Sequence, residues 1–440
     1  MELPPGLDRP ARSWVEGRHA GGRCLALVLR GGPFVAAIHQ ELAPPLVPGS
    51  VRLPATRRVG ATMIIGHYMT RIWDAGGIAA YICRVAAAQR AAGHTVRFLD
   101  SDATYATCAD PDRRPEIVAP EDLAAHGRAL GLDVLHLHTS VDPMPRGGPR
   151  VVRTIHEHRP YCPSGERYLK RSETPCDRVY GPVRCLWGHV VDRCGSMRPL
   201  SMAKNFAATR QERRCLPGHT LIAISRYVHD QMVLSGFDGA PIHVLHNPAP
   251  TPRPYVPPTR DGVPRFLFLG RLSVHKGLQW LLRCLPEVTV PIALDIGGDG
   301  PQRAEMEALV ARAGLGQLVT FHGWIDEPRI DQLAAAARAV VFPAVWHEPA
   351  GLVTLDASAR GRAVIASRTG GIPEFAIEGR NAILVEPNHD RALAEAMTRL
   401  ATDWDLARQL GQGGLELASE DFSLERHCVE LDRIYEGLAR

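Results

Sequence analysis

Two acidic side chains, Glu348 and Asp356, flank an expected helix start in the stretch "AVVFPAVWHEPAGLVTLDASARGRAVIAS". The apolar run that opens this stretch has the length of a buried strand, and a helix-like segment follows Gly351. At a helix start, here Leu352 and Val353, the backbone N–H groups lack intrahelical acceptors and favour a phosphate. A carboxylate offers two acceptor oxygens, which suits a pair of sugar hydroxyls. The stretch therefore predicts a sugar-nucleotide site, although either acid alone would also fit an ordinary helix.

Two cations lie in a second stretch, "FLFLGRLSVHKGLQWLL". The strand expected there ends at Gly270, and Arg271 and Lys276 follow in the loop before a helix that begins near Gly277. Ligands of open α/β sheets bind beyond the carboxyl ends of the strands. Two cations beside a helix start would hold a dianionic diphosphate, whereas two solvated loop cations are the alternative.

The elements that must position these side chains alternate between strands and helices. "TMIIGHY", "HTVRFLD" and "DVLHLHT" read as strands, and "GGIAAYICRVAAAQRAAG" reads as a helix. The alternation begins again after the proline-rich segment "PAPTPRPYVPPTRDGVP". Short apolar strands separated by helical segments indicate parallel sheets covered on both faces. The sequence therefore predicts an α/β protein with two doubly wound, Rossmann-like domains that face a central cleft.

The composition shifts predict where these domains begin and end. Residues 1–60 are rich in Pro, Gly and Arg and show no sustained period, so we expect a disordered or weakly packed N-terminal extension. The further predicted segments are an acceptor-binding domain over 61–248 with a cysteine-containing insert at 159–199, a linker at 249–263, a nucleotide-sugar domain over 264–422, and a C-terminal helix at 423–440 that crosses back to the first domain.

The charge and cysteine content limit the classes of function. The net charge of +4 arises within residues 1–60, which hold eight arginines and four acids, so the remaining residues balance. This balance argues against nucleic-acid binding through a broad basic face. No apolar run approaches the roughly 20 residues of a membrane span. Ten cysteines without a secretory signal favour a reducing compartment, so we expect a cytoplasmic protein.

Several motifs taken together resemble one family. "GRLSVHKGL", "IGGDGP", "FHGWI", "EPAGLVTLDASARGRAVIAS" and "GGIPEFAIEGRNAILVEP" follow the order and spacing of the family-4 retaining glycosyltransferases, the group 1 transferases of the GT-B fold. The N-terminal half adds "DAGGIAAYI" and "DVLHLH". The resemblance spans residues 62–440, and its joint motifs are more specific than any one of them.

The resemblance implies roles for the residues identified above. Arg271 and Lys276 correspond to the pair that holds the donor diphosphate. Glu348 corresponds to the first acid of the family's Glu-x7-Glu motif, which contacts the transferred sugar. Asp356 stands where the second glutamate, the usual ribose ligand, should be. Because Asp is shorter by one methylene, the ribose contact would be longer, water-bridged or lost.

Backbone groups complete the donor site that the resemblance implies. Gly76 and Gly77 are similar to the family's N-terminal glycine loop, which lets the backbone pass close to the donor phosphate. Gly351, Leu352 and Val353 would bind the donor through the helix start on the other domain.

Histidines follow two of the expected strands. His136 and His138 point the same way because alternate residues of a strand share a face, and His156 and His158 repeat this geometry. The family commonly has an active-site histidine at the place of His138, so we assign His138 a catalytic role and treat His156 as an acceptor-side candidate. A shared metal site and ordinary core histidines remain the alternatives.

Four cysteines, Cys162, Cys176, Cys185 and Cys194, lie in one polar segment with gaps of 13, 8 and 8 residues. With His189 they could hold a structural zinc ion, although the spacing lacks a paired Cys-x2-Cys knuckle and free thiols are the alternative. The segment's basic residues could attract a lipid-linked pyrophosphate or an anionic bilayer. They are Arg167, Lys170, Arg171, Arg178, Arg184 and Arg193.

We expect a retaining, metal-independent transferase in which Glu348, His138, Arg271 and Lys276 act at the reacting centre. The donor would be a UDP- or GDP-linked sugar, and the acceptor a glycan or polyprenyl-linked glycan of surface polysaccharide synthesis, with contact at the inner face of the membrane. The leaving phosphate would help to deprotonate the incoming hydroxyl, so no cofactor is required for catalysis. A weakly active scaffold homologue and another GT-B enzyme, such as a sugar-nucleotide epimerase, are the alternatives.

Overall fold

The computed structural model describes residues 13–19, 22–28, 61–74, 76–108 and 110–438. Two compact units divide the chain at residues 43 and 44. The first contains strands β1 (Ser13–His19) and β2 (Gly22–Val28), which pair antiparallel with Ser13 opposite Val28. These two strands lie within residues 1–60, for which we predicted a disordered or weakly packed extension; the rest of that segment lies outside the described residues.

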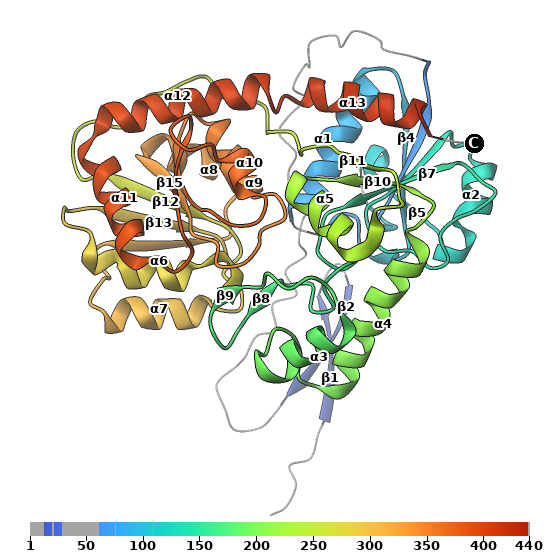
Figure 1. Cartoon of the computed structure of the whole chain (residues 1–440), viewed down its shortest axis with the longest axis horizontal. Helices are drawn as coiled ribbons and strands as arrows, with labels where there is room; N and C mark the ends of the chain where they lie inside the picture. Colours follow the sequence, from blue (N-terminus) through green and yellow to red (C-terminus); the bar gives the residue numbers. More distant parts are fainter. Residues whose placement is uncertain (1–12, 20–21, 29–60, 75, 109, 439–440) are drawn as a thin grey trace, which may run out of the picture. The chain divides into compact units, whose positions relative to one another are not determined.

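The second unit holds both predicted α/β domains. In the N-terminal domain seven strands form a parallel sheet in the order β11-β10-β7-β6-β3-β4-β5 (Figure 1). Its elements are β3 (Ile64–Tyr68), α1 (Gly77–Ala91), β4 (Thr95–Asp100), β5 (Glu116–Ile117), α2 (Leu123–Ala129), β6 (Val134–Leu137), β7 (Arg150–Ile155), α4 (Pro199–Cys215), β10 (Thr220–Ala223), α5 (Arg226–Met232) and β11 (Ile242–Val244).

The insert between β7 and α4 has little regular structure. It contains the short antiparallel strands β8 (Tyr168–Leu169) and β9 (Thr174–Pro175) and the helix α3 (Pro182–Val191). Such a segment has few apolar residues with which to form its own core, and it depends on its neighbours or on cross-links for order.

Six parallel strands form the C-terminal sheet, in the order β14-β13-β12-β15-β16-β17. Its elements are β12 (Arg265–Leu269), α6 (Leu278–Cys284), β13 (Ala293–Gly297), α7 (Arg303–Arg312), β14 (Val319–Gly323), α8 (Glu327–Ala336), β15 (Ala339–Phe342), α9 (Leu352–Ser358), β16 (Ala363–Ser367), α10 (Ile372–Phe375), β17 (Ala382–Val385), α11 (Asp390–Thr402), α12 (Trp404–Glu420) and α13 (Leu424–Glu436).

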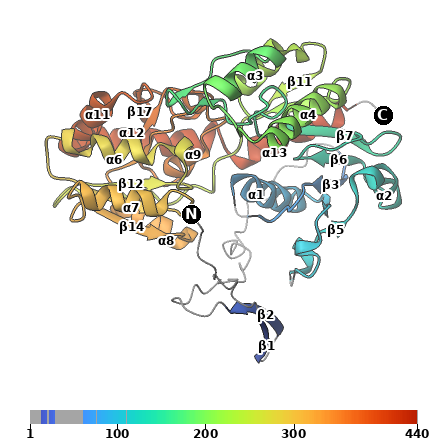
Figure 2. The same ribbon diagram turned by 90° about the horizontal axis from the view of Figure 1, so that it is seen from below.

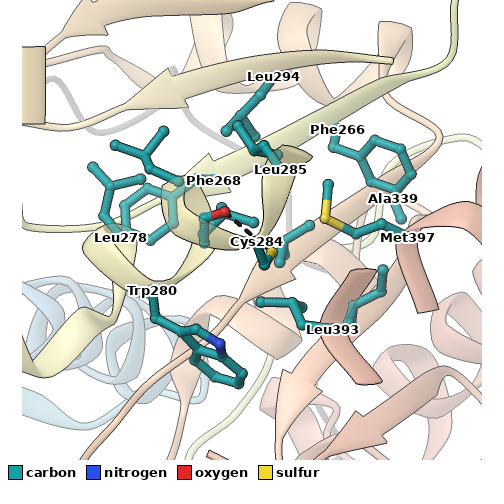
Figure 3. Close-up of a cluster of buried hydrophobic side chains, with 14 of the residues drawn as sticks. Phe266, Phe268, Leu278, Trp280, Cys284, Leu285, Leu294, Ala339, Leu393 and Met397 are labelled. Carbon is teal, nitrogen blue, oxygen red and sulfur yellow. Dashed lines mark hydrogen bonds between the residues drawn. The ribbon is translucent and has the colours of Figure 1, made fainter. Parts of the chain in front are cut away.

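Apolar residues cover both faces of this sheet because successive strand side chains point to opposite sides. On β12, Phe266 and Phe268 belong to one buried cluster and Leu267 to another. Figure 3 shows the first cluster, in which Phe266 and Phe268 gather with side chains from α6 and α11, including Trp280 and Met397. Unlike an alternating amphipathic strand, β12 therefore reads as a continuous apolar run.

The last helix packs on the domain from which the chain started. α12 lies on the C-terminal domain, and α13 continues to the side of α1, as Figures 1 and 2 show. Tyr81 of α1 contacts His427 of α13 through Oη and Nε2, 3.1 Å apart. Residues 249–263, the predicted linker, contain no helix or strand.

Charged contacts fasten one domain to the other at the carboxyl side of the sheets. The Glu374 carboxylate accepts hydrogen bonds from the backbone N–H groups of Arg226 and Tyr227 at the start of α5, and it lies 2.8 Å from His246 Nε2. Ser225 Oγ donates to the Pro349 carbonyl over 2.6 Å, next to Glu348. Among the described residues, no helix combines the length and apolar character that crossing a bilayer requires.

Candidate active site

Lys276 and Glu348, predicted separately as donor ligands, meet in the structure. Lys276 Nζ donates to Glu348 Oε2 over 2.7 Å, and Trp346 Nε1 donates to the same oxygen over 2.8 Å. The side chains of Lys276 and Glu348 are 21% and 13% exposed, so water screens the pair only in part. Within the described part of the chain, Glu348 Oε1 has no hydrogen-bond partner, so it can accept a hydrogen bond from a ligand.

Backbone contacts hold the two loops together. They follow the adjacent parallel strands β12 and β15, and Val345 N donates to the His275 carbonyl over 3.0 Å. Gly277 has φ +71°, and a Cβ there would lie 1.7 Å from the Pro343 carbonyl oxygen. Only glycine fits this place, so the approach of Lys276 to Glu348 depends on it.

A second glycine contact fixes Glu348 from the other side. The Glu348 carbonyl accepts a hydrogen bond from Gly371 N over 2.8 Å, and a Cβ on Gly370, which has φ +58°, would lie 2.3 Å from that oxygen. The motif "GGIPEF" therefore supports the acid loop.

Arg271 lies in the same tight loop as Lys276. The Arg271 backbone carbonyl accepts a hydrogen bond from Ser273 N. The Ser273 carbonyl in turn accepts a hydrogen bond from Lys276 N. Unlike Lys276, the exposed Arg271 side chain has no ion-pair or hydrogen-bond partner among residues 61–438 that the structure describes. Gly298, from the motif "IGGDGP", packs against the Gly270 carbonyl and so supports this loop, as a structural turn does.

The predicted second acid, Asp356, lies on α9 and turns toward a cation of its own helix. Its Oδ1 lies 3.5 Å from Arg360 Nη1, and its side chain is 38% exposed. Arg360 is bound more closely by Asp331, at 2.7 Å. The Asp356 carboxylate is therefore only weakly engaged.

The starts of two helices from different domains lie side by side. α9 begins after Gly351, which has φ +75°, and α1 begins at Gly77 with Gly76 as its N-cap. A Cβ on Gly77 would lie 2.9 Å from Leu352 Cδ1. The structure thus brings the predicted glycine loop to the predicted donor helix, and Val353 follows Leu352 in its first turn.

Buried histidines form a hydrogen-bonded chain at the ends of β3, β6 and β7. His156 Nε2 lies 3.1 Å from His138 Nδ1, His138 Nε2 lies 2.9 Å from His67 Nδ1, and His67 Nε2 lies 2.8 Å from Gln89 Oε1. Gln89 Oε1 can only accept, so His67 Nε2 carries the proton and donates to it. It follows that each neutral ring of the chain accepts a hydrogen bond at Nδ1 and donates one from Nε2. The chain then ends at His156 Nδ1, the one ring nitrogen in this row without a described partner.

The rings in this row stay neutral. Burial lowers the pKa of His67 to about 4 and that of His156 to about 3. Burial, followed by the neighbouring His136 and His67, lowers the pKa of His138 well below its usual range. Both nitrogens of His138 are already hydrogen-bonded, so the open end of the chain is on His156.

The four histidines considered as an alternative metal site do not all lie together in the structure. Of the histidines considered, His136 and His138 lie near each other, and the close group among the described residues includes His67 instead of His156 and His158. His158 bonds elsewhere: its Nδ1 lies 2.7 Å from Tyr161 Oη, and its Nε2 lies 2.6 Å from the His347 carbonyl. Strand order, which the sequence does not reveal, pairs His67 with His136.

Sequence reasoning missed three residues that shape this site. His67 stands in an ordinary apolar strand, and Trp346 was seen only as part of a loop. Tyr435 lies on α13, and its Oη is 2.7 Å from His136 Nδ1. The contacts of His67 and Tyr435 arise only from the pairing of distant segments, whereas Trp346 lies two residues from Glu348. The four predicted cysteines, by contrast, do gather: all of them line one cavity.

Two family models match the chain. Residues 75–253 match the family described as Glycosyltransferase Family 4, and residues 263–403 match Glycosyl transferases group 1. The two matches meet at the predicted linker and confirm the resemblance drawn from the motifs.

Characterised and uncharacterised relatives share part of this sequence. An uncharacterized glycosyltransferase of Methanocaldococcus jannaschii is 30% identical over 178 residues, which are 40% of this chain and 45% of the relative. The alpha-maltose-1-phosphate synthase of Mycolicibacterium smegmatis is 35% identical over 186 residues, 39% of this chain and 47% of that protein. The chain thus matches somewhat under half the length of these relatives.

Solved structures share the fold over a longer range. Sucrose-phosphate synthase from Thermosynechococcus elongatus has a TM-score of 0.65 at 21% identity, over 85% of this chain and 98% of that one. HepE of Anabaena, in complex with UDP-glucose, has a TM-score of 0.62 at 17% identity, over 86% of this chain and 100% of that one. These likenesses show that the predicted GT-B fold is correct.

The buried histidines predict a loss of stability in mild acid. The pKa of His67 and His427 is about 4 in the folded chain, and that of His156 and His158 is about 3, against 6.5 for a free histidine. As the pH falls below 6.5, these histidines bind protons in the unfolded chain but not in the folded chain. The free energy of unfolding therefore decreases between pH 6.5 and pH 4. Thermal unfolding should show the melting temperature falling by more than about 5 °C between pH 7 and pH 5.

His67→Gln should make this fall smaller, and the exposed control His243→Gln should leave it unchanged. A melting temperature that is flat over this range would show that the histidines are not held neutral in the fold.

Proposed function

We propose an activity for this chain, which belongs to the family-4, group 1 glycosyltransferases: it transfers a sugar, with retention of configuration, from a nucleoside diphosphate to a hydroxyl of a glycan acceptor. The observation that carries the proposal is the meeting of Lys276 and Glu348 at 2.7 Å, with the unpaired Arg271 in the same loop. Cations and a carboxylate with one open oxygen match the two halves of such a donor, a diphosphate and a hydroxyl-bearing sugar.

The electrostatics of the site suit the departure of a diphosphate. In the transition state, negative charge builds up on the oxygen that leaves the anomeric carbon. Arg271 and Lys276 would stabilise this charge without added divalent cation, and Glu348 Oε1 would accept a hydroxyl of the sugar. The anomeric C–O bond to phosphate breaks while a new C–O bond forms on the same face, and the acceptor's proton passes to the diphosphate.

Asp356 and the two helix starts would bind the remainder of the donor. Asp356 lies one turn beyond Leu352, the first residue of α9, where it would contact a ribose hydroxyl directly or through water. Gly76 and Gly77 with Leu352 would place backbone near the phosphates. HepE binds UDP-glucose, and a UDP- or GDP-linked hexose is the donor we propose here.

On the acceptor side we propose a role for the histidine chain. His156 Nδ1, as a neutral acceptor, would orient the incoming hydroxyl, and His138 would hold the His156 ring through its Nδ1. Because the pKa of His156 is about 3, the ring positions the hydroxyl but does not take up its proton.

Substitution of Arg271 and Glu348 should separate binding from chemistry. Arg271→Ala should weaken the affinity for UDP or GDP about tenfold, because it removes a charge-assisted contact to phosphate. Glu348→Gln should lower turnover at least about 100-fold while changing the affinity for the nucleotide by less than about threefold. Titration calorimetry with UDP, GDP and their sugars, together with an assay of sugar release, measures both.

Arg312→Ala, which removes an exposed arginine on α7, is the matched control and should leave both values unchanged. The proposed site would be refuted if Arg271→Ala left the affinity for the nucleotide unchanged, or if Glu348→Gln kept full turnover.

The insert suggests where a lipid-linked acceptor would be met. On α3, Val183, Leu186, Trp187 and Val190 share one helical face, and they are 81%, 46%, 63% and 56% exposed. Leu200, at the start of α4, is 80% exposed. With Met197, which is 56% exposed, six large apolar side chains of α3 and the segment after it are open to solvent, which is unusual for a soluble surface.

Basic residues lie in the same part of the chain. Four of them are exposed and have no ion-pair partner among the described residues; they are Arg184, Arg193, Arg198 and Lys204. An apolar helix face with tryptophan and a basic rim matches an anionic bilayer surface, where the apolar side chains enter the headgroup boundary. We therefore assign the α3 face to peripheral membrane contact, which would bring a polyprenyl-linked glycan to the N-terminal domain.

Trp187→Ser should weaken sedimentation with vesicles of equal parts phosphatidylcholine and phosphatidylglycerol by several-fold, since it removes a large apolar contact. Trp324→Ser is the matched control, because Trp324 is 65% exposed on the other domain and should not affect binding. Equal loss in both variants, or a Trp187-dependent dimer in light scattering without vesicle binding, would contradict the membrane assignment.

A further inference from the structure

The four cysteines of the insert come from four different segments and surround one cavity. Cys162 follows β7, Cys176 follows β9, Cys185 lies within α3, and Cys194 follows that helix. All four line the cavity together with His189. None of them forms a disulfide.

Other groups at the cavity suit a thiolate-bound cation. His189 is 1% exposed, and its Nδ1 lies 3.4 Å from Cys194 Sγ and 2.9 Å from the Cys185 carbonyl. Its Nε2 is buried and has no hydrogen-bond partner among the described residues. Arg167 and Arg178 also line the cavity, and Arg178 Nη1 lies 2.6 Å from Asp192 Oδ2. Four thiolates around a divalent cation leave two negative charges, and Arg167 would offset one of them.

The size of the cavity favours a single ion over a cluster. Its volume is about 20 Å³, which is room for one water-sized species and too little for a four-iron cluster. No three of the sulfur atoms lie within 4.8 Å of one another among the described residues, so the sulfur atoms would have to move toward one another to bind a single ion.

We propose that Cys162, Cys176, Cys185 and Cys194 bind one zinc ion that orders the insert, with His189 as a hydrogen-bonding neighbour of Cys194. A segment of about forty residues with two short strands and one helix is of the size that metals commonly stabilise. The ion would tie together four segments whose backbone is otherwise connected mainly by loops.

The same insert braces the loops of the donor site. Glu166 Oε2 lies 3.4 Å from His275 Nε2, next to Lys276, and Asp177 Oδ1 lies 2.7 Å from His347 Nε2, next to Glu348. Tyr168 is buried in the same apolar cluster as the C-terminal sheet. The zinc ion therefore supports the donor site from the other domain; this second consequence rests on the proposed function.

The test measures metal directly. Full-length protein, purified without chelator, should contain about one zinc per chain by mass spectrometry, and its four cavity thiols should react with a thiol reagent only after denaturation. Cys176→Ser should lose the zinc, and Cys194→His, which keeps a ligand, should retain it. Cys215→Ser, at a half-buried cysteine outside the cavity, is the matched control and should keep one zinc.

Removal of zinc from the wild type should lower the melting temperature and weaken donor affinity several-fold, and added zinc should restore both. Metal-free protein with four reactive thiols, iron with inorganic sulfide, or two disulfides would each overturn the proposal. Zinc content does not depend on catalysis, so zinc without any donor binding would leave the metal site standing and refute the proposed function.

Discussion

The ion pair between Lys276 and Glu348 is the interaction around which the site is built. A lysine and a carboxylate 2.7 Å apart and mostly shielded from water hold each other in place, and hydrogen bonds to charged groups contribute about 1.5–3 kcal/mol. The pair exists because two adjacent strands end side by side and because Gly277 lets one loop touch the backbone of the next. The ion pair and the glycine contact together fix the positions of the two loops. Glu348 Oε1 and the Arg271 side chain remain available to a ligand.

The N-terminal domain contacts the loop that carries Glu348. His158 Nε2 is hydrogen-bonded to the backbone carbonyl of His347, and Asp177 is hydrogen-bonded to the ring of His347. Two side chains therefore hold the residue before Glu348. Glu374 caps the start of α5 from the opposite domain. Although burial raises the pKa of Glu374, its hydrogen bonds from His246 and the α5 backbone lower it overall, which keeps the cap charged. The two domains are therefore coupled at the loops that would bind the donor.

The sequence predicted the parts of this arrangement that depend on local pattern. Apolar runs such as β12 and the helix period of α1 marked both domains, and joint motifs predicted that Arg271, Lys276 and Glu348 belong to one site. Contacts between distant segments could not be predicted, because period and spacing do not give strand order or helix docking. His67 beside His136 and Tyr435 against His136 are of this kind. The apolar face of α3 was readable in its spacing, but its exposure was not, since the same spacing is typical of a buried helix face.

The most direct test of the central claim is a double-mutant cycle on donor affinity. Calorimetry would give the dissociation constant of the preferred nucleotide sugar for the wild type, Lys276→Met, Glu348→Gln and the double variant. If the two side chains form one coupled unit at the donor, their effects should depart from additivity by at least about 1 kcal/mol. Effects that add within about 0.3 kcal/mol would contradict the account, because they would show that the pair does not act together on the donor.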